Sequence, residues 1–404
     1  MTIQRWLRFC FFNLLLVAGL GVLLRYKIAF SLPIVDQKNV LHSHSHFAFT
    51  GWITQALFVL LVHYLLLQNK AGAFKKYKYL LATNMLAAYG MLVSFILQGY
   101  GLYSISFSTL SILVAFIFSY QYWKDLRDIN GTGITHHWLK AALIFNVISA
   151  AGAFTLAFVM ALKLSSQKIY LASVYYFLHF QYNGWFFFAC MGLFFYAAKC
   201  FNHKRAKIIF WLFAISCVPA YFLSVLWAAI HPLLYLLVVV AAAAQTIAWG
   251  LFIHLLLSEK KQVVLAFGKT AGRLLLLSAI ACSIKLLLQL GSVVPYLSDL
   301  AFSFRPIVIG YLHLVLLGVI SLFLLGYMVS AQLVNVTALT AAGIVVFVCG
   351  IFFNELLLMV QGVAAITGTW IPYTNESLFG AALLLFTGIL IINLSIRSLD
   401  GLEV

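Results

Sequence analysis

The sequence predicts an all-α integral membrane protein of twelve transmembrane helices with both termini in the cytoplasm. Of its 404 residues, 64% are hydrophobic and only 8% are charged, and the mean hydropathy is +1.05. Soluble domains carry about 25% charged residues, so this composition excludes a soluble enzyme, a nucleic-acid-binding module and a disordered scaffold. Lipid is the expected solvent and partner for most of the chain.

Apolar stretches of about 20 residues, the length that crosses a bilayer, recur along the whole chain. The first follows Arg5 and Arg8 and lacks a small-residue cleavage site, so we expect a helix rather than a signal peptide. The breaks near 104 and 229 are the least marked, because no charge separates the neighbouring stretches. The predicted helices span 6–30, 41–67, 79–103, 105–123, 138–162, 170–198, 208–228, 230–257, 270–291, 307–333, 338–363 and 377–397.

The charge of the loops predicts the orientation. With the amino terminus placed inside, eighteen of the 25 Lys and Arg fall on the cytoplasmic side, as the positive-inside tendency requires. Lys285 lies within a helix. The bias predicts a multi-pass protein of a bacterial cytoplasmic membrane. The basic residues on the outer side are Arg25, Lys27, Lys38, Lys163, Lys168 and Arg305.

The eleven histidines divide between the two membrane sides, and ionisable residues within membrane helices are functional candidates by default. Five fall at cytoplasmic helix ends, where an imidazole at the interface needs no special role. The other six lie in the outer halves of even-numbered helices: His42, His44, His46, His179, His231 and His313.

Three outer histidines share the pattern His-x4-Gly and recur at almost equal spacing. His46, His179 and His313 lie 133 and 134 residues apart, on the second, sixth and tenth predicted helices. This spacing predicts a threefold repeat of a four-helix unit (1–123, 138–257 and 270–397) within a single domain, 1–404. Coincidence together with ordinary helix-packing glycines is the alternative. Neutral imidazole is a common ligand of metals and haem, and each glycine leaves room for a flat macrocycle.

Two segments resemble ligand segments of the haem-copper oxidase superfamily, the main subunits of cytochrome oxidases and nitric oxide reductases. They are His42-Ser-His-Ser-His46-Phe-Ala-Phe-Thr-Gly51-Trp52 and Tyr311-Leu-His313 with Gly318. The resemblance implies three pseudo-symmetric four-helix arcs. It also implies a haem, of b type, held by His313 and by His46 or His42.

The sequence departs from the family at the positions that complete its metal centre. The tenth helix has one histidine instead of two, residues 208–228 contain none, and His179 has Asn183 where the family has tyrosine. The stretch Trp227-x3-His231-Pro232-x2-Tyr235 resembles the family's copper-ligand helix but comes two helices late. His179 and His231 are therefore candidates for a second metal, copper or iron. Proline in the first turn of a helix is the simpler interpretation of that stretch.

The expected function is a membrane haem protein that carries out redox chemistry or binds a diatomic gas, NO or O2. Whether it is an oxidoreductase stays open. Arg305 and the other outer cations suit haem propionates, and they equally suit ordinary interfacial positions. Because the chain has no CxxCH site, we expect a quinol or a separate cytochrome as electron donor.

Two further charges lie inside predicted helices. Glu355 is a candidate for a proton path, with Lys285 as its expected partner, and a purely structural pair is the alternative. The six cysteines form no CxxC motif and are expected to be apolar packing residues.

Two rival functions remain. A twelve-helix secondary transporter without haem is the first, although transporters typically show twofold inverted repeats. A quinone- or lipid-modifying enzyme that uses the outer histidines as acid–base groups is the second.

Overall fold

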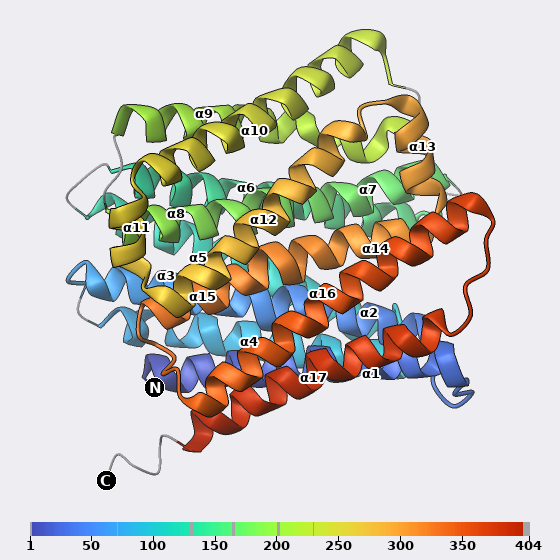
Figure 1. Cartoon of the computed structure of the whole chain (residues 1–404), viewed down its shortest axis with the longest axis horizontal. Helices are drawn as coiled ribbons and strands as arrows, with labels where there is room; N and C mark the ends of the chain where they lie inside the picture. Colours follow the sequence, from blue (N-terminus) through green and yellow to red (C-terminus); the bar gives the residue numbers. More distant parts are fainter. Residues whose placement is uncertain are drawn as a thin grey trace. The chain divides into compact units, whose positions relative to one another are not determined.

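The computed structural model describes residues 2–70, 72–129, 133–163, 166–199, 203–228 and 230–398, which form helices and no strand (Figure 1). Eleven helices of this described part are long and apolar enough to cross a membrane. The chain is therefore a multi-pass membrane protein. Its contacts divide it into two compact units, 1–118 with 331–404 and 119–330.

The first unit brings together the two ends of the chain. α1 packs along α17, and α17 packs along α16. The second membrane-spanning helix is built from α2, the π-helical segment η1 and α3, and it packs against α4. The elements of this unit are α1 (Ile3–Phe30), α2 (Gln37–Phe47), η1 (Ala48–Thr54), α3 (Gln55–Leu67), α4 (Ala73–Gln98), the first part of α5 (Leu102–Arg127), α16 (Ala338–Thr367) and α17 (Thr374–Ser398).

The second unit is continuous in sequence. α6 packs against α7 and α8, α9 against α10, and α12 against α15. Its elements after α5 are α6 (Ile134–Ala161), α7 (Gln167–His179), η2 (Phe180–Phe186), α8 (Phe187–Ala198), α9 (His203–Ala220), η3 (Tyr221–Ala228), α10 (Pro232–Ser258), α11 (Lys260–Phe267), α12 (Lys269–Gly291), α13 (Pro295–Ser303), α14 (Arg305–His313), η4 (Leu314–Ser321) and α15 (Leu322–Ser330).

Local chemistry sets several helix ends. The side chains of Asp36 and Thr337 accept hydrogen bonds from backbone amides of the first turns of α2 and α16, which satisfies donors that a helix start leaves free. α4 ends at Gly99, whose φ of 62° lies in the region that glycine tolerates. The break expected near 104 therefore lies a few residues earlier.

The segment predicted as a helix at 170–198 is helical, but it is not among the eleven apolar helices. Its middle carries Gln181, Tyr182 and Asn183, so its composition is less apolar than that of its neighbours. The short helices α11 and α13 lie in stretches that the sequence pattern assigned to loops.

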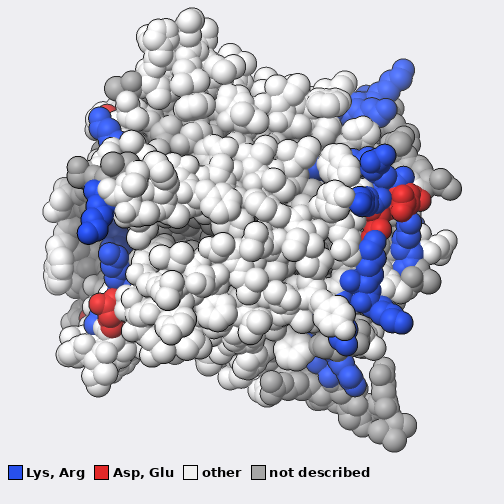
Figure 2. Space-filling view, turned by 180° about the vertical axis from the view of Figure 1, so that it is seen from behind, with Lys and Arg blue, Asp and Glu red and all other residues white. Residues whose placement is uncertain are grey.

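Charge and small residues fit a membrane setting. On the face that Figure 2 draws, Lys and Arg gather at the ends of the helices and uncharged side chains cover the surface between them. α16 and α17 approach closely through glycine: a Cβ on Gly388 would lie 2.4 Å from the backbone nitrogen of Phe347. Cys10, Cys190, Cys217 and Cys282 are buried and unbridged, as expected, whereas Cys349 is exposed and Cys200 lies outside the described residues.

Candidate functional site

Each of the three His-x4-Gly motifs runs into a π-helical segment. η1 begins two residues after His46, η2 directly after His179, and η4 directly after His313. π-helical turns are rare, and they are frequent at functional sites. The three motifs therefore share a local backbone structure as well as a sequence pattern.

Side chains from neighbouring helices bind the displaced carbonyl groups of η1. Asn13 Nδ2 on α1 donates to the carbonyl of Gly51 over 2.6 Å, and its Oδ1 accepts from the Tyr89 hydroxyl over 2.6 Å. Asn84 Nδ2 on α4 donates to the carbonyl of Thr50 over 3.2 Å. Such contacts compensate for the interrupted helical hydrogen bonds.

In the second unit, polar side chains also contact η2 and η4. Cys217 Sγ donates to the carbonyl of Asn183 over 3.8 Å, and Gln181 Nε2 donates to Asn146 Oδ1 over 3.2 Å. Ser278 Oγ donates to the carbonyl of Val319, in η4, over 2.7 Å.

These contacts follow the repeat in sequence. Asn13 precedes His46 by the same number of residues as Asn146 precedes His179, and Asn84 follows His46 as Cys217 follows His179. These four positions were not among the predicted site residues, although they recur at the period of the histidines.

The motif glycines face packed side chains. A Cβ on Gly51 would lie 2.8 Å from the Phe47 ring, and one on Gly184 would lie 2.6 Å from Phe145 Cβ. The Cβ of Ala281 lies 3.1 Å from the corresponding point on Gly318. The expected room for a macrocycle beside these glycines is therefore taken up by packing, which is the ordinary role of glycine in membrane helices.

His42 and His46 share one face of α2, as their spacing predicts, and they meet an aromatic cluster. The His46 ring stacks on Phe95 with 4.4 Å between centroids, and the His42 ring meets Tyr100 edge-on at 4.7 Å. His46 Nε2 lies 3.4 Å from the Tyr100 hydroxyl. The buried Nε2 of His42 has no hydrogen-bond partner within the described part of the chain.

His44 faces away from this cluster, toward α1. Its Nδ1 donates to the carbonyl of Val17 over 3.1 Å, because a carbonyl oxygen can only accept.

Both ring nitrogens of His179 are occupied in the structure. Nε2 donates to the carbonyl of Cys217 over 2.8 Å, and Nδ1 accepts from Asn183 Nδ2 over 3.1 Å. A metal ligand needs one of these nitrogens, so the metal role predicted for His179 would require one of the two hydrogen bonds to break.

His313 has the hydrogen bond that often accompanies a ligating histidine. Nδ1 donates to the carbonyl of Ile309 over 2.8 Å, which puts the lone pair of the neutral ring on Nε2. Arg305, at the start of the same helix, is exposed.

His231 caps the start of α10. Its Nδ1 accepts from the backbone amide of Leu233 over 3.3 Å, and Pro232 occupies the first turn. The simpler interpretation of this stretch is thus confirmed. Among the described contacts, no hydrogen bond or ring contact joins His231 to His179, so their shared metal stays a prediction.

Glu355, the candidate for a proton path, is half-buried on α16. Glu355, on α16, interacts electrostatically with Arg25 of α1 in the same unit, and its Oε1 accepts from Asn354 Nδ2 over 3.1 Å. Arg25 is therefore a cation that acts on Glu355 within the first unit, and the pairing with Lys285 stays a prediction.

Lys285 is 7% exposed and lines a cavity of about 20 Å³ in the second unit. Its electrostatic partners in that unit include Cys217, Cys282 and His179. A cavity of this size holds about one water molecule.

The described residues contain no group of three His, Cys, Asp or Glu side chains placed to hold a metal ion. No family model matches the chain, and no curated protein sequence matches it. The assignment of a function therefore depends on the geometry above.

Proposed function

We propose that the protein is a membrane haem protein that acts in redox chemistry or binds NO or O2, with a haem ligand on the His42–His46 face of α2. The observation that carries the proposal is the buried, unpaired Nε2 of His42. A buried polar atom without a partner costs about 1–3 kcal/mol. An iron atom is a partner that an imidazole nitrogen binds well.

The surroundings of His42 and His46 support a flat apolar group. Phe95 and Tyr100 supply aromatic faces beside both rings. Tyr100 holds the edge of His46 through its hydroxyl group. A bound haem supplies an iron centre that exchanges one electron or binds a diatomic gas, while the chain orients the imidazoles and excludes water.

His313 and the second metal enter the proposal with less support. The Nδ1 hydrogen bond of His313 suits a ligand, and a second ligand from His313 remains a prediction. A copper or iron ion at His179 and His231 has no supporting contact among the described residues. We also propose twelve spans, with both termini in the cytoplasm of a bacterial cell.

The test is the optical spectrum of the detergent-purified protein before and after dithionite, with iron and copper analysis of the same sample. A Soret band and a sharp reduced α band are expected. The His42→Ala or His46→Ala variant should lose or shift them. His44→Ala is the matched control, because His44 lies on the same helix but faces Val17. A colourless, correctly folded protein from haem-replete cells contradicts the proposal.

A secondary transporter is the second candidate. The observation that favours it is an interrupted helix: α9 contains Pro219 and passes into the 3-10 segment η3, where Val225 has non-helical backbone angles (φ −130°, ψ 20°). Transporters often use such broken helices at their substrate sites. The expected haem spectrum, together with no uptake of solutes into vesicles that contain the protein, would exclude this candidate.

A further inference from the structure

Two π-helical segments of the second unit border the small cavity of about 20 Å³. η2 contributes Tyr182 and Asn183 to its wall, and η4 contributes Val315 and Val319. α12 contributes Lys285, which is 7% exposed. Because π-helical turns are frequent at functional sites, a cavity that two of them share with a buried ammonium group is a candidate binding site.

The acidic residues of the second unit lie away from this cavity's ammonium group. Asp125 and Asp128 lie at the end of α5 and Glu259 directly follows α10, so all three belong to the predicted cytoplasmic side, whereas Lys285 lies in the outer half of α12. Asp299, on α13, is exposed. The whole sequence of 119–330 contains these four acidic residues and no other.

The remaining neighbours of Lys285 do not supply a negative charge. Its electrostatic partners include Cys217, Cys282 and His179, and neither a thiol nor an imidazole group is an anion at neutral pH in its ordinary form. In the first unit, Glu355 interacts with Arg25. A buried ammonium group is unfavourable unless an anion compensates it, so the cavity beside it favours an anionic ligand.

A neutral hydrogen-bond donor lies in the same wall. Gln245, on α10, lines the cavity and is buried. Its Oε1 accepts a hydrogen bond from Gln289 Nε2 over 2.6 Å, which fixes the orientation of its amide group. The two N–H groups of Gln245 are therefore oriented as donors, and together with the ammonium group they suit an anion.

The size and the apolar part of the wall restrict the anion to a small monovalent one. A cavity of about 20 Å³ holds about one water molecule, and a chloride ion is only slightly larger. The rings of Phe187, Phe188 and Phe213 also line the cavity. Such rings cannot replace the hydration shell of a multivalent anion, so sulfate and phosphate are too large and too strongly hydrated for this site.

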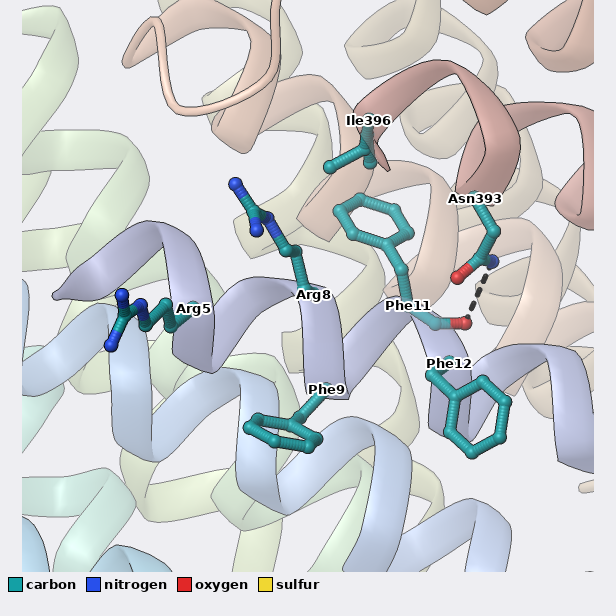
Figure 3. Close-up of a pocket in the computed structure, with 7 residues that line it drawn as sticks. All are labelled: Arg5, Arg8, Phe9, Phe11, Phe12, Asn393 and Ile396. Atoms are coloured by element: carbon teal, nitrogen blue, oxygen red, sulfur yellow. Dashed lines mark hydrogen bonds between the residues drawn. The ribbon is translucent and has the colours of Figure 1, made fainter. Parts of the chain in front are cut away.

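A cavity of about 420 Å³ in the first unit provides a contrast (Figure 3). Arg5 and Arg8 line it near the start of α1, and Arg5 is exposed. An exposed guanidinium group keeps its hydration and needs no bound anion. Arg5 is therefore a matched control for Lys285: both are basic residues that line a cavity, and only Lys285 is withdrawn from water.

We propose that the cavity beside Lys285 binds one halide ion, chloride in the cell, through the Lys285 ammonium group and the amide of Gln245. The ion compensates the charge of Lys285 and allows an ammonium group to be buried between η2, η4 and α12. This site is separate from the proposed haem ligands on α2, and it is detected through the halide itself.

The test is equilibrium dialysis of the full chain, purified in detergent, against radioactive chloride in gluconate buffer of constant ionic strength. One chloride ion per chain is expected, with displacement by bromide and none by sulfate. The Lys285→Met variant should bind chloride at least about tenfold more weakly, because it loses a charged hydrogen-bond donor. Arg5→Gln should bind it as the parent does.

A second variant keeps the ammonium group in place. In Gln245→Glu a carboxylate lies beside Lys285 and still accepts from Gln289, so it should take over the role of the anion and abolish chloride binding. Chloride should also raise the midpoint of thermal unfolding of the parent relative to gluconate, and leave the midpoints of Lys285→Met and Gln245→Glu unchanged.

Three results would overturn the proposal. The first is a parent chain that binds no chloride, as expected if Glu355 compensates Lys285 or if water fills the cavity. The second is chloride binding that persists in both Lys285→Met and Gln245→Glu. The third is displacement of chloride by sulfate as readily as by bromide. None of these measurements uses the haem spectrum, so a colourless protein would contradict the proposed function and leave the halide site standing.

Discussion

Two of the outer histidines differ in what their ring nitrogens do. His179 uses both nitrogens in hydrogen bonds to Cys217 and Asn183, whereas the buried Nε2 of His42 has no such partner. An imidazole with two hydrogen bonds fixes the packing of three helical segments. One with an unpaired buried nitrogen is suited to a ligand.

The role of His179 predicts a loss of stability on its removal. The His179→Ala variant removes the hydrogen bonds to the carbonyl of Cys217 and to the side-chain amide of Asn183, and each hydrogen bond in a membrane protein contributes up to about 1–2 kcal/mol. We expect the free energy of unfolding in detergent to fall by about 1–3 kcal/mol. His254→Ala, at an exposed position, should leave it unchanged. Equal stability of the two variants would show that these hydrogen bonds are not stabilising.

The interaction of Arg25 with Glu355 predicts coupled effects. Removing one charge leaves the other half-buried in an apolar setting, which is more costly than removing both. The Arg25→Gln and Glu355→Gln variants should each lower the free energy of unfolding. The double variant should lower it by less than the sum of the two single effects. A double-mutant cycle is expected to give a coupling energy of about 0.5–3 kcal/mol. A coupling energy near zero would mean that the two charges act independently.

At the scale of elements, the π-helical segments connect the His-x4-Gly motifs to the neighbouring helices. A polar side chain on a neighbouring helix binds a carbonyl group of each segment, as Asn13 does for Gly51. The Asn13→Ala variant removes this bond and the one to Tyr89. We expect faster amide hydrogen exchange across 48–54 than in the parent, with no change across 314–321. Exchange that is unchanged in both segments would contradict the role given to Asn13.

The contact between α16 and α17 predicts a contrast between two glycines of one helix. A methyl group on Gly388 meets the Phe347 backbone at 2.4 Å, whereas nothing lies within 4 Å of that on Gly380. Gly388→Ala should therefore destabilise the protein by about 1–3 kcal/mol. Gly380→Ala should be neutral or stabilise it by up to about 1 kcal/mol. Unfolding curves that shift equally for both would contradict the close approach of the two helices.

The helices were predictable because each long apolar stretch has only a helix available to it in lipid. The shared face of His42 and His46 follows from their spacing alone. The partners of His179 and Glu355 did not follow, because Cys217 and Arg25 are distant in sequence and only tertiary packing brings them close. The π-helical segments leave no hydropathy signal. Asn13 and Asn146 occupy equivalent positions before His46 and His179, and this match could have pointed to them. It becomes visible only when the repeats are aligned on the histidines.

At the scale of the whole molecule, the basic residues predict the direction of every helix across the membrane. The exposed Lys38 lies on the predicted outer side and the exposed Lys260 on the inner side. In intact cells, a membrane-impermeant maleimide should label the Lys38→Cys variant and leave Lys260→Cys unlabelled until the cells are permeabilised. The parent chain controls for its own cysteines. The reverse labelling pattern would invert the proposed orientation.

The first unit is discontinuous in sequence, since 1–118 associates with 331–404. At a translation rate of about 5–20 residues per second, the ribosome needs roughly 10–40 s to make the intervening segment. During that interval the face of α1 that will contact α17 has no protein partner, and bilayer lipid or the insertion machinery covers it. When α17 emerges, it must therefore displace whatever covers α1, so this unit can be completed only after the second unit has been synthesised.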